Sequence, residues 1–246
     1  MPAVSHRWPR FSEPPQTGCF RDDLNPYHAR HLAMGYPLVP ASTLWTWRGR
    51  WSALFGQAAP LHVEIGSGNG FFLAGMAQNH PNWNWLGIEI RYKRVVLTAN
   101  KLIRAGVANA VIGRYDAWYL DDLLLPGSVA GLYVNHPDPW PKVRHAKHRL
   151  ISRWFLEVAA GLLTPGGRLC IKSDVMDTID RVESLLASGP EGEPLPRLPL
   201  TIEAHRANVF TEGPAWSDDV ETNYQHKFRN RKLPVAAVLL RRSAAT

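Results

Sequence analysis

The chain has 246 residues, of which 45% are hydrophobic and 20% are charged, so it can bury the core of one large domain or two small ones. The formal net charge of +7 favours an anionic partner, although excess charge also serves solubility. There is no apolar run of about eighteen residues and no apolar signal core near the N-terminus. We therefore predict a cytoplasmic protein that makes no membrane contact.

The first forty residues are rich in proline, histidine and arginine and have weak periodicity. We predict that residues 1–40 form an N-terminal arm that is partly mobile and that residues 41–246 form a single domain. The arginines of the arm could touch nucleic acid, but a solvated tail explains them better. Residues 41–56 carry three tryptophans, and we predict a short helix there that covers one sheet edge, with the tryptophans as packing residues.

Apolar strand patterns then alternate with helical patterns along the chain. We predict a first strand from residue 61 that runs into a glycine-rich turn, further strands over 84–90, 109–116, 128–135 and 167–174, and helices over 71–80, 91–106, 148–163 and 176–188. A proline-rich surface loop over 189–199 precedes two closing strands, of which the last is a candidate antiparallel edge strand. This order predicts an α/β, Rossmann-like fold with a doubly wound, mostly parallel sheet.

The turn after the first strand places glycines at Gly66, Gly68 and Gly70, where a backbone can approach a ligand without a side-chain clash. A dinucleotide fingerprint needs its third glycine at the position of Phe71, so a nicotinamide enzyme is a distant alternative. The turn instead resembles the cofactor loop of class I S-adenosylmethionine-dependent methyltransferases, in which Glu64 would stand just ahead of it.

Two further acids follow the next two predicted strands at the same sheet edge. Glu89 lies about twenty residues beyond the turn, where an acid can accept hydrogen bonds from ribose hydroxyls. Asp116 can accept a hydrogen bond from an adenine amino group. For both Glu89 and Asp116 the alternative is a carboxylate at the surface without a ligand. S-adenosylmethionine has no phosphate and carries a positive sulfonium, so it tolerates three acids. We expect no metal site. The two cysteines, Cys19 and Cys170, form neither a disulfide framework nor a zinc pattern, and we place Cys170 in the core.

Residues 135–150 read NHPDPWPKVRHAKHRL. Three prolines restrict the loop around Asp138, so we expect a rigid carboxylate beyond the end of a strand. A basic run follows, and it can contact the phosphates of a polyanion or form a solvated helix start. Its fixed positive charges are Lys142, Arg144, Lys147 and Arg149.

Together with VEIGSGNG and GIEI upstream, this stretch resembles the tRNA (guanine-N7-)-methyltransferase family over residues 60–180 and again near ETNYQHKF. The resemblance implies a class I methyltransferase fold, S-adenosylmethionine as donor and a guanosine of the tRNA variable loop as acceptor. The implied and inferred cofactor contacts are Glu64, Gly66, Gly68, Gly70, Glu89, Asp116 and Asp138. The implied and inferred substrate contacts are Lys142, Arg144, Asp174, Thr222, Asn223, Tyr224 and Gln225. The family usually has glutamate where this chain has Gln225, and the amide oxygen of glutamine is a weaker acceptor.

Guanine N7 carries no proton, so its methylation needs no general base, and alignment of the reacting atoms is the main task. Our hypothesis is that Asp138 stabilises the positive charge that develops on the base or holds the base in register. Two alternatives stay open: a methyltransferase for another substrate, and a tRNA-binding protein that has lost catalysis. We expect a monomer, with a homodimer as the alternative.

Overall fold

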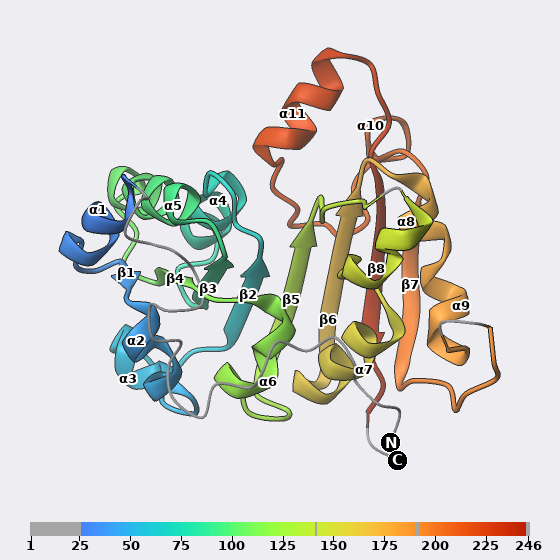
Figure 1. Cartoon of the computed structure of the whole chain (residues 1–246), viewed down its shortest axis with the longest axis horizontal. Coiled ribbons are helices and arrows are strands. Elements are labelled where there is room, and N and C mark those ends of the chain that lie inside the picture. The colour runs from blue at the N-terminus through green and yellow to red at the C-terminus, as the bar shows by residue number, and fades with distance from the viewer. Residues whose placement is uncertain (1–25, 141, 190–191, 245–246) are drawn as a thin grey trace.

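The computed structural model describes residues 26–140, 142–189 and 192–244. Among these residues, eight strands form one sheet in the order β1-β4-β3-β2-β5-β6-β8-β7 (Figure 1). The strands are β1 Leu38–Val39, β2 Leu61–Ile65, β3 Asn84–Glu89, β4 Ala110–Arg114, β5 Val129–Asn135, β6 Leu163–Ser173, β7 Leu200–Arg206 and β8 Ala236–Arg242. The pairs from β1 to β6 are parallel, so the predicted doubly wound α/β sheet is confirmed.

The predicted antiparallel strand is confirmed as β8, with one difference in its place. β8 pairs with both β6 and β7 and runs antiparallel to each. It therefore lies one position in from the edge, and β7 is the outermost strand. After β7 the chain crosses above the sheet and returns as β8, between β6 and β7. That crossover carries α10 and α11, which project at the top of Figure 1.

Helices cover both faces of the sheet. On one face α4 and α5 pack through residues such as Phe72, Val95 and Leu102. On the other face α3, α6, α7 and α9 pack through residues such as Trp51, Phe155 and Leu186. The helical segments are α1 His28–Ala33, α2 Ala41–Leu44, η3 Trp45–Trp47, α3 Trp51–Phe55, α4 Phe71–Asn79, α5 Tyr92–Ala105, η4 Ala117–Tyr119, α6 Leu120–Leu123, η5 Val143–His148, α7 Arg153–Leu162, α8 Met176–Asp180, α9 Val182–Ala187, α10 Val209–Glu212 and α11 Asn223–Asn230.

Local hydrogen bonds set several boundaries that differ from the prediction. The helix expected from residue 148 begins at Arg153, because the Ser152 side chain accepts from the Phe155 N–H and caps it. The helix expected over 176–188 is divided at Arg181 into α8 and α9. Gly106, in the left-handed conformation at φ 66°, ends α5 as predicted.

The described part of the N-terminal segment contacts the sheet before residue 41. Leu38 and Val39 form β1 and pair with β4, and α1 packs on α5. Residues 1–25, which include most of the predicted arm and Cys19, lie outside the described residues. The helix predicted over 41–56 is present as α2, η3 and α3, with Trp51 buried.

Cys170 is fully buried in β6, as predicted. Burial raises the pKa of its thiol well above the usual value, so it stays protonated. In the described residues, no helix combines the length and the apolar character that a membrane crossing needs.

Candidate active site

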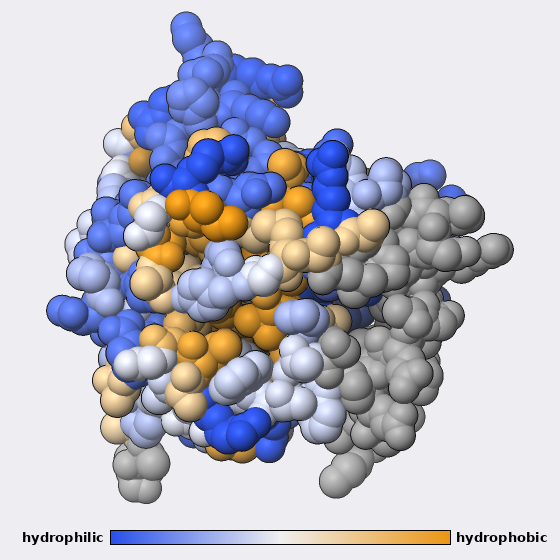
Figure 2. All heavy atoms as spheres, turned by 90° about the vertical axis from the view of Figure 1, so that its left-hand side faces the viewer, coloured by the Kyte–Doolittle hydropathy of each residue, from blue (hydrophilic) through white to orange (hydrophobic). Residues whose placement is uncertain are grey.

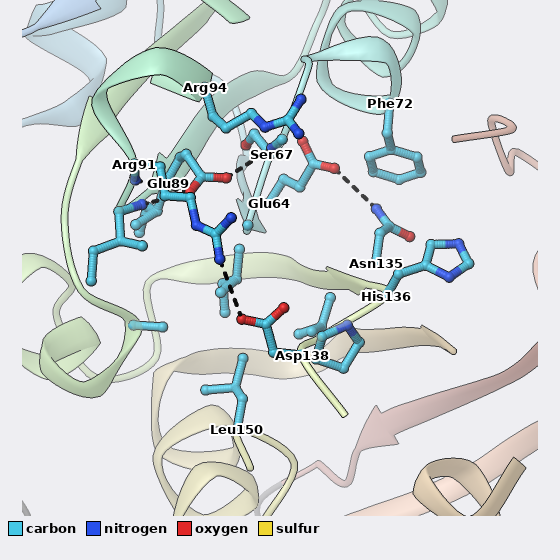
Figure 3. Close-up of a pocket in the computed structure, with 18 of the residues that line it drawn as sticks. Glu64, Ser67, Phe72, Glu89, Arg91, Arg94, Asn135, His136, Asp138 and Leu150 are labelled. Carbon is cyan, nitrogen blue, oxygen red and sulfur yellow. Dashed lines mark hydrogen bonds and ion pairs between the residues drawn. The ribbon is translucent and has the colours of Figure 1, made fainter. Parts of the chain in front are cut away.

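A cavity of about 470 Å³ opens at the carboxyl ends of β2, β3, β4 and β5. This is the edge where open parallel sheets bind ligands. Its walls come from the glycine-rich turn, the ends of β3 and β4, the loop after β5 and the first residues of α11. Figure 3 shows residues of the turn, of the end of β3 and of the loop after β5. The volume falls in the range of small-molecule sites.

The glycine-rich turn keeps its shape through left-handed backbone. Gly66 has φ 75° and Gly68 has φ 56°, a region that residues with a Cβ rarely adopt. Both line the cavity, whereas Gly70 lies outside the lining. A Cβ on Gly70 would lie 2.9 Å from the Thr98 Cα, so Gly70 allows α4 to approach α5 closely.

Glu89 ties this turn to the end of β3. Its Oε2 accepts from the Gly68 N–H at 3.0 Å, and its Oε1 accepts from the N–H groups of Ile90 at 2.9 Å and Arg91 at 3.0 Å. Three backbone donors on one mostly buried carboxylate fix both the acid and the turn. Each carboxylate oxygen can accept two hydrogen bonds, so Oε1 is fully used and Oε2 keeps one acceptor site for a ligand.

Glu64 ends up buried beneath the same turn, with 2% of its surface exposed. Its Oε1 accepts from the Asn135 Nδ2 at 3.0 Å. Its Oε2 has no hydrogen-bond partner among the described residues. Burial raises the pKa of Glu64 to about 7, although the Asn135 amide, the nearby Ser67 hydroxyl and the positive charge of Lys172 act in the opposite direction. An unsatisfied buried acceptor in a cavity wall marks a place for a donor or a cation.

Asp116 follows β4 and begins η4, where its Oδ1 accepts from the Trp118 N–H at 3.0 Å. Burial raises the pKa of Asp116. Trp118 also lines the cavity and stacks on Trp154, with ring centroids 4.6 Å apart. The structure thus brings Glu64, Glu89 and Asp116 from three neighbouring strands to one cavity, as the sequence predicted.

The loop after β5 forms the opposite wall. His136 has φ 52° and Trp140 has φ 40°, and the described residues hold a single further non-glycine residue with positive φ, Lys232. Such conformations cluster at functional sites, where the surrounding structure holds them in place. Asp138 lies at the rim with 71% of its side chain exposed and points toward Arg91, whose Nη2 is 4.0 Å from its Oδ2 (Figure 3). The predicted meeting of Asp138 with the glycine-rich turn in one cavity is therefore present.

The N-terminus of α11 completes the cavity. Thr222 caps the helix by accepting from the Gln225 N–H at 2.9 Å, and Asn223 and Tyr224 follow it into the lining. Gln225 is instead buried, with 5% exposed, outside the lining. Its Oε1 accepts from the Lys172 Nζ at 3.0 Å, so the amide oxygen already has a strong donor. A guanine contact by Gln225 stays a prediction.

Comparison with known proteins places this geometry in a family. Residues 58–236 match the model of a family described as "Putative methyltransferase". Over 200 residues the chain is 36% identical to a tRNA (guanine-N(7)-)-methyltransferase of Geobacillus kaustophilus, covering 81% of this chain and 87% of that protein. The chain belongs to the tRNA (guanine-N7-)-methyltransferase family. A relative of the same name from Streptococcus thermophilus is 35% identical over 167 residues, which are 67% of this chain and 78% of that protein.

A solved structure shares the fold. The 16S rRNA methyltransferase KamB superposes with a TM-score of 0.53 and 16% sequence identity, over 79% of this chain and 93% of that chain. At this level of identity the likeness concerns the fold alone. The class I methyltransferase fold expected from the glycine-rich turn is confirmed.

The other predicted substrate contacts lie beside the cavity. Lys142 and Arg144 are exposed at the start of η5 and do not line it. Asp174 also lies outside the lining, and its Oδ1 faces the His136 Nδ1 at 3.2 Å. Within the basic segment His148 reaches the lining, where its ring packs against Trp140 at 5.2 Å.

Lys172 is a structural residue that the sequence reading missed. It is fully buried in β6, and its Nζ donates to Asp219 Oδ1 at 2.8 Å, to the Val220 carbonyl at 3.1 Å and to Gln225 Oε1. Burial raises the pKa of Asp219, and Lys172 opposes that rise. A lysine inside an otherwise apolar strand pattern was the available signal, because a buried ammonium requires partners. These bonds hold the loop before α11 against the sheet.

Proposed function

We propose that the chain transfers a methyl group from S-adenosylmethionine to N7 of a guanosine in the variable loop of tRNA, in the cytoplasm. One observation carries the proposal: a single cavity joins the glycine-rich turn and three acids to the Asp138 loop and the start of α11. The names of the family relatives at 35–36% identity support tRNA and guanine N7 as the acceptor.

The acceptor groups that line the cavity fit S-adenosylmethionine. This cofactor supplies an electrophilic methyl group on a positively charged sulfonium. The unpartnered Oε2 of Glu64 offers an acceptor to a cationic group, and three acids in one cavity favour a ligand without phosphates. Gly66 leaves open space where a side chain would stand, since nothing lies within 4 Å of a Cβ built there.

Each acid would hold a different part of the cofactor. Glu89, fixed by three backbone donors, would accept from a ribose hydroxyl with the one acceptor site that remains on its Oε2. Asp116 would accept from the adenine amino group beside the Trp118 ring. Glu64 would face the positive charge of the amino-acid part. The backbone of Gly66 and Gly68 would lie against the cofactor without a side chain between them.

The acceptor base needs alignment more than activation. N7 presents a lone pair and no proton, so none of the cavity residues has to act as a general base. The base gains positive charge as the new bond forms. Asp138 at the rim would stabilise that charge, and its Oδ2 lies 4.0 Å from the Arg91 Nη2 (Figure 3). Tyr224, half exposed at the start of α11, offers a ring on which a base can stack.

The surroundings of the cavity suit a nucleic acid. Arg144 and Lys147 are exposed on η5, Lys142 is exposed just before it, and α11 adds Lys227 and Arg229, the latter paired with Glu221. Figure 2 shows the upper part of this side of the molecule, where α11 projects, as mainly hydrophilic. Phosphate contacts from such residues position a tRNA without selecting its sequence.

Mapping of the methylated position tests the proposal. Unmodified tRNA transcripts are incubated with the protein and S-adenosylmethionine, and 7-methylguanosine is located by chemical cleavage of the RNA at that base. We expect one cleavage site, in the variable loop, that disappears when its guanosine is replaced by adenosine. Cleavage elsewhere would refute the variable loop. Cofactor binding without any methylation of tRNA would favour a protein that has lost catalysis or acts on another substrate.

A further inference from the structure

His136 occupies an unusual place at the junction of the two walls. It follows β5 directly, and its N–H donates to the Lys172 carbonyl at 2.8 Å, which continues the β5–β6 pairing by one residue. At φ 52° its backbone is left-handed, a conformation that is disfavoured for a residue with a Cβ. This turn directs the His136 ring away from the Asp138 side of the loop, toward the side of Asn135 and Phe72 (Figure 3).

The ring is held by a carboxylate from the next strand. The His136 Nδ1 lies 3.2 Å from Asp174 Oδ1, and this hydrogen bond is the main reason why the pKa of Asp174 is lowered. An ionised carboxylate can only accept, so the proton of this bond belongs to Nδ1. In the neutral imidazole the second nitrogen, Nε2, is then an acceptor.

Two rings of α11 hold the same imidazole from the other side. The His136 ring stacks on Tyr224 with centroids 5.7 Å apart and on Phe228 at 6.1 Å. The side chain is 4% exposed, and Nε2 has no hydrogen-bond partner among the described residues. His136 and Tyr224 both line the cavity. A buried acceptor without a partner, on a ring fixed by three neighbours, requires an explanation.

We propose that His136 is a specificity-determining residue for the target base, with Nε2 accepting a hydrogen bond from the N1–H or the 2-amino group of guanine. Asp174 is then a positioning residue that acts through His136 by fixing its tautomer. The inference rests on the proposed function, and it assigns to Asp174 an indirect role in place of a direct contact with the base.

The chemistry of the bases makes such an acceptor selective. Guanine presents two donors, N1–H and the 2-amino group, at its Watson–Crick edge, where adenine presents the N1 acceptor. Enzymes that act on an extruded base read this edge with hydrogen bonds and stacking. As N7 gains its methyl group the base becomes cationic and its N1–H becomes a stronger donor. A bond to Nε2 therefore strengthens toward the transition state, which is the condition for an interaction to raise the rate.

A packing role alone accounts for less of the geometry. A phenylalanine at position 136 could stack on Tyr224 and Phe228 equally well and would leave neither a buried orphan nitrogen nor a need for Asp174. The substitution His136→Phe therefore separates the two roles, because it keeps an aromatic ring and removes the acceptor. His205→Phe is the matched control, since His205 also faces an aspartate, Asp180 at 3.6 Å, but lies on β7 at the far edge of the sheet.

The test compares kcat/KM for methyl transfer to three tRNA transcripts. They carry guanosine, inosine (no 2-amino group) or 1-methylguanosine (no N1–H) at the target position. We expect the wild-type protein to lose about tenfold or more on at least one analogue, the size of one buried hydrogen bond. His136→Phe should lose about 10- to 100-fold on guanosine and treat that analogue and guanosine alike within about threefold. His205→Phe should behave as wild type.

Several outcomes overturn the inference, and they are distinguishable. If wild-type protein methylates guanosine-bearing tRNA but treats both analogues like guanosine, His136 does not read the base, while the proposed function stands. The same holds if His136→Phe keeps both its rate and its discrimination. If wild-type protein methylates no tRNA at N7, the proposed function fails and this inference fails with it.

A second measurement uses the wild-type protein, so it does not depend on whether a His136 variant folds. The ¹⁵N spectrum of the wild-type protein should show the His136 ring with a protonated Nδ1 and an unprotonated Nε2. Asp174→Ala should mix the two tautomers and reduce the discrimination against the analogue, whereas a purely structural role of Asp174 would change the melting temperature alone. A wild-type ring with its proton on Nε2 would contradict the assignment directly.

Discussion

The two walls of the cavity are built in different ways. We call the glycine-rich turn with the ends of β2, β3 and β4 the cofactor wall, and the loop after β5 with the start of α11 the substrate wall. On the cofactor wall, Glu89 bonds to Ile90 and Arg91 beside it in the chain and to the turn 21 residues away, and its hydrogen bonds are made within the protein. On the substrate wall, the contacts that fix the loop and α11 join His136 to Asp174 and Lys172 to Asp219, 38 and 47 residues apart. Glu89 is therefore fixed by residues nearer in the chain than those that fix the loop after β5 and α11, while the Glu64–Asn135 hydrogen bond, 71 residues apart, joins the two walls.

The two walls differ in backbone strain, although each keeps a buried acceptor without a partner among the described residues, Glu64 Oε2 on the cofactor wall and His136 Nε2 on the substrate wall. The cofactor wall holds its turn in glycine conformations, which cost little strain. The substrate wall has left-handed conformations at His136 and Trp140, and a buried acceptor at His136 Nε2. Strain and orphan groups persist where a ligand or the surrounding fold compensates for them. This difference predicts that changes on one wall will leave the ligand of the other largely unaffected.

The largest effect should come from Lys172→Met. This change leaves Asp219 buried without its partner, so we expect the free energy of unfolding to fall by about 3–5 kcal/mol. The loop before α11 loses its anchor, and tRNA methylation should weaken more than cofactor binding. Urea denaturation measures the first effect. Arg241→Met is the control, because the Arg241–Glu203 pair is 39% exposed on both sides and should contribute about 1 kcal/mol or less. Equal losses in the two variants would contradict the buried anchor.

On the cofactor wall, Glu89→Gln replaces an acceptor of three backbone N–H groups by an amide with one acceptor oxygen. We expect the Kd for S-adenosylmethionine to rise about 10- to 100-fold, as a charged hydrogen bond is lost and the turn loosens. Calorimetric titration gives this value, and gel-shift binding of tRNA should stay within about threefold of wild type. A tRNA affinity that falls as far as the cofactor affinity would show that the walls are not independent.

Asp138 lies at the rim between the walls, and its 71% exposure limits its electrostatic effect by solvent screening. We expect Asp138→Asn to lower kcat about tenfold, with the Kd for the cofactor nearly unchanged. Single-turnover methyl transfer at saturating tRNA measures the chemical step. Full turnover in this variant would exclude Asp138 from stabilising the developing charge.

The smallest predicted effect is the change of stability and of cofactor affinity with pH, which we attribute to Glu64. Burial raises the pKa of Glu64 from 4.5 to about 7, so the folded protein keeps a proton that the unfolded chain loses. Its contribution to apo stability therefore declines as pH rises from about 4.5 to about 7. A cationic cofactor favours the ionised form, so S-adenosylmethionine affinity should rise severalfold as pH passes through about 7. Glu64→Gln should flatten both dependences, although Lys172 and Glu89 also act on this site. An unchanged pH profile in Glu64→Gln would rule out Glu64 as the titrating group.

The comparison of the walls also explains what the sequence could predict. Glu64, Glu89 and Asp116 end buried strands whose residues are continuous in the chain, so the strand pattern alone brings them to one edge. The partnership of Lys172 with Asp219 and Gln225 depends on how β8 enters the sheet, which no local pattern specifies. The left-handed backbone of His136 and its contact with Asp174 likewise arise only when β5 and β6 pair. No local pattern therefore singled out His136, whereas the predicted substrate contact of Gln225 came from the family resemblance alone.

We propose that one cavity brings the methyl group of S-adenosylmethionine to guanine N7, and the predictions above for methyl transfer depend on this. The most direct test supplies methyl-labelled S-adenosylmethionine with two tRNA transcripts, one with guanosine and one with 7-deazaguanosine at the target position, and digests both to nucleosides. We expect label in 7-methylguanosine from the first transcript and none from the second, which lacks the N7 atom. Equal labelling of both transcripts, or label in a different nucleoside, would contradict it.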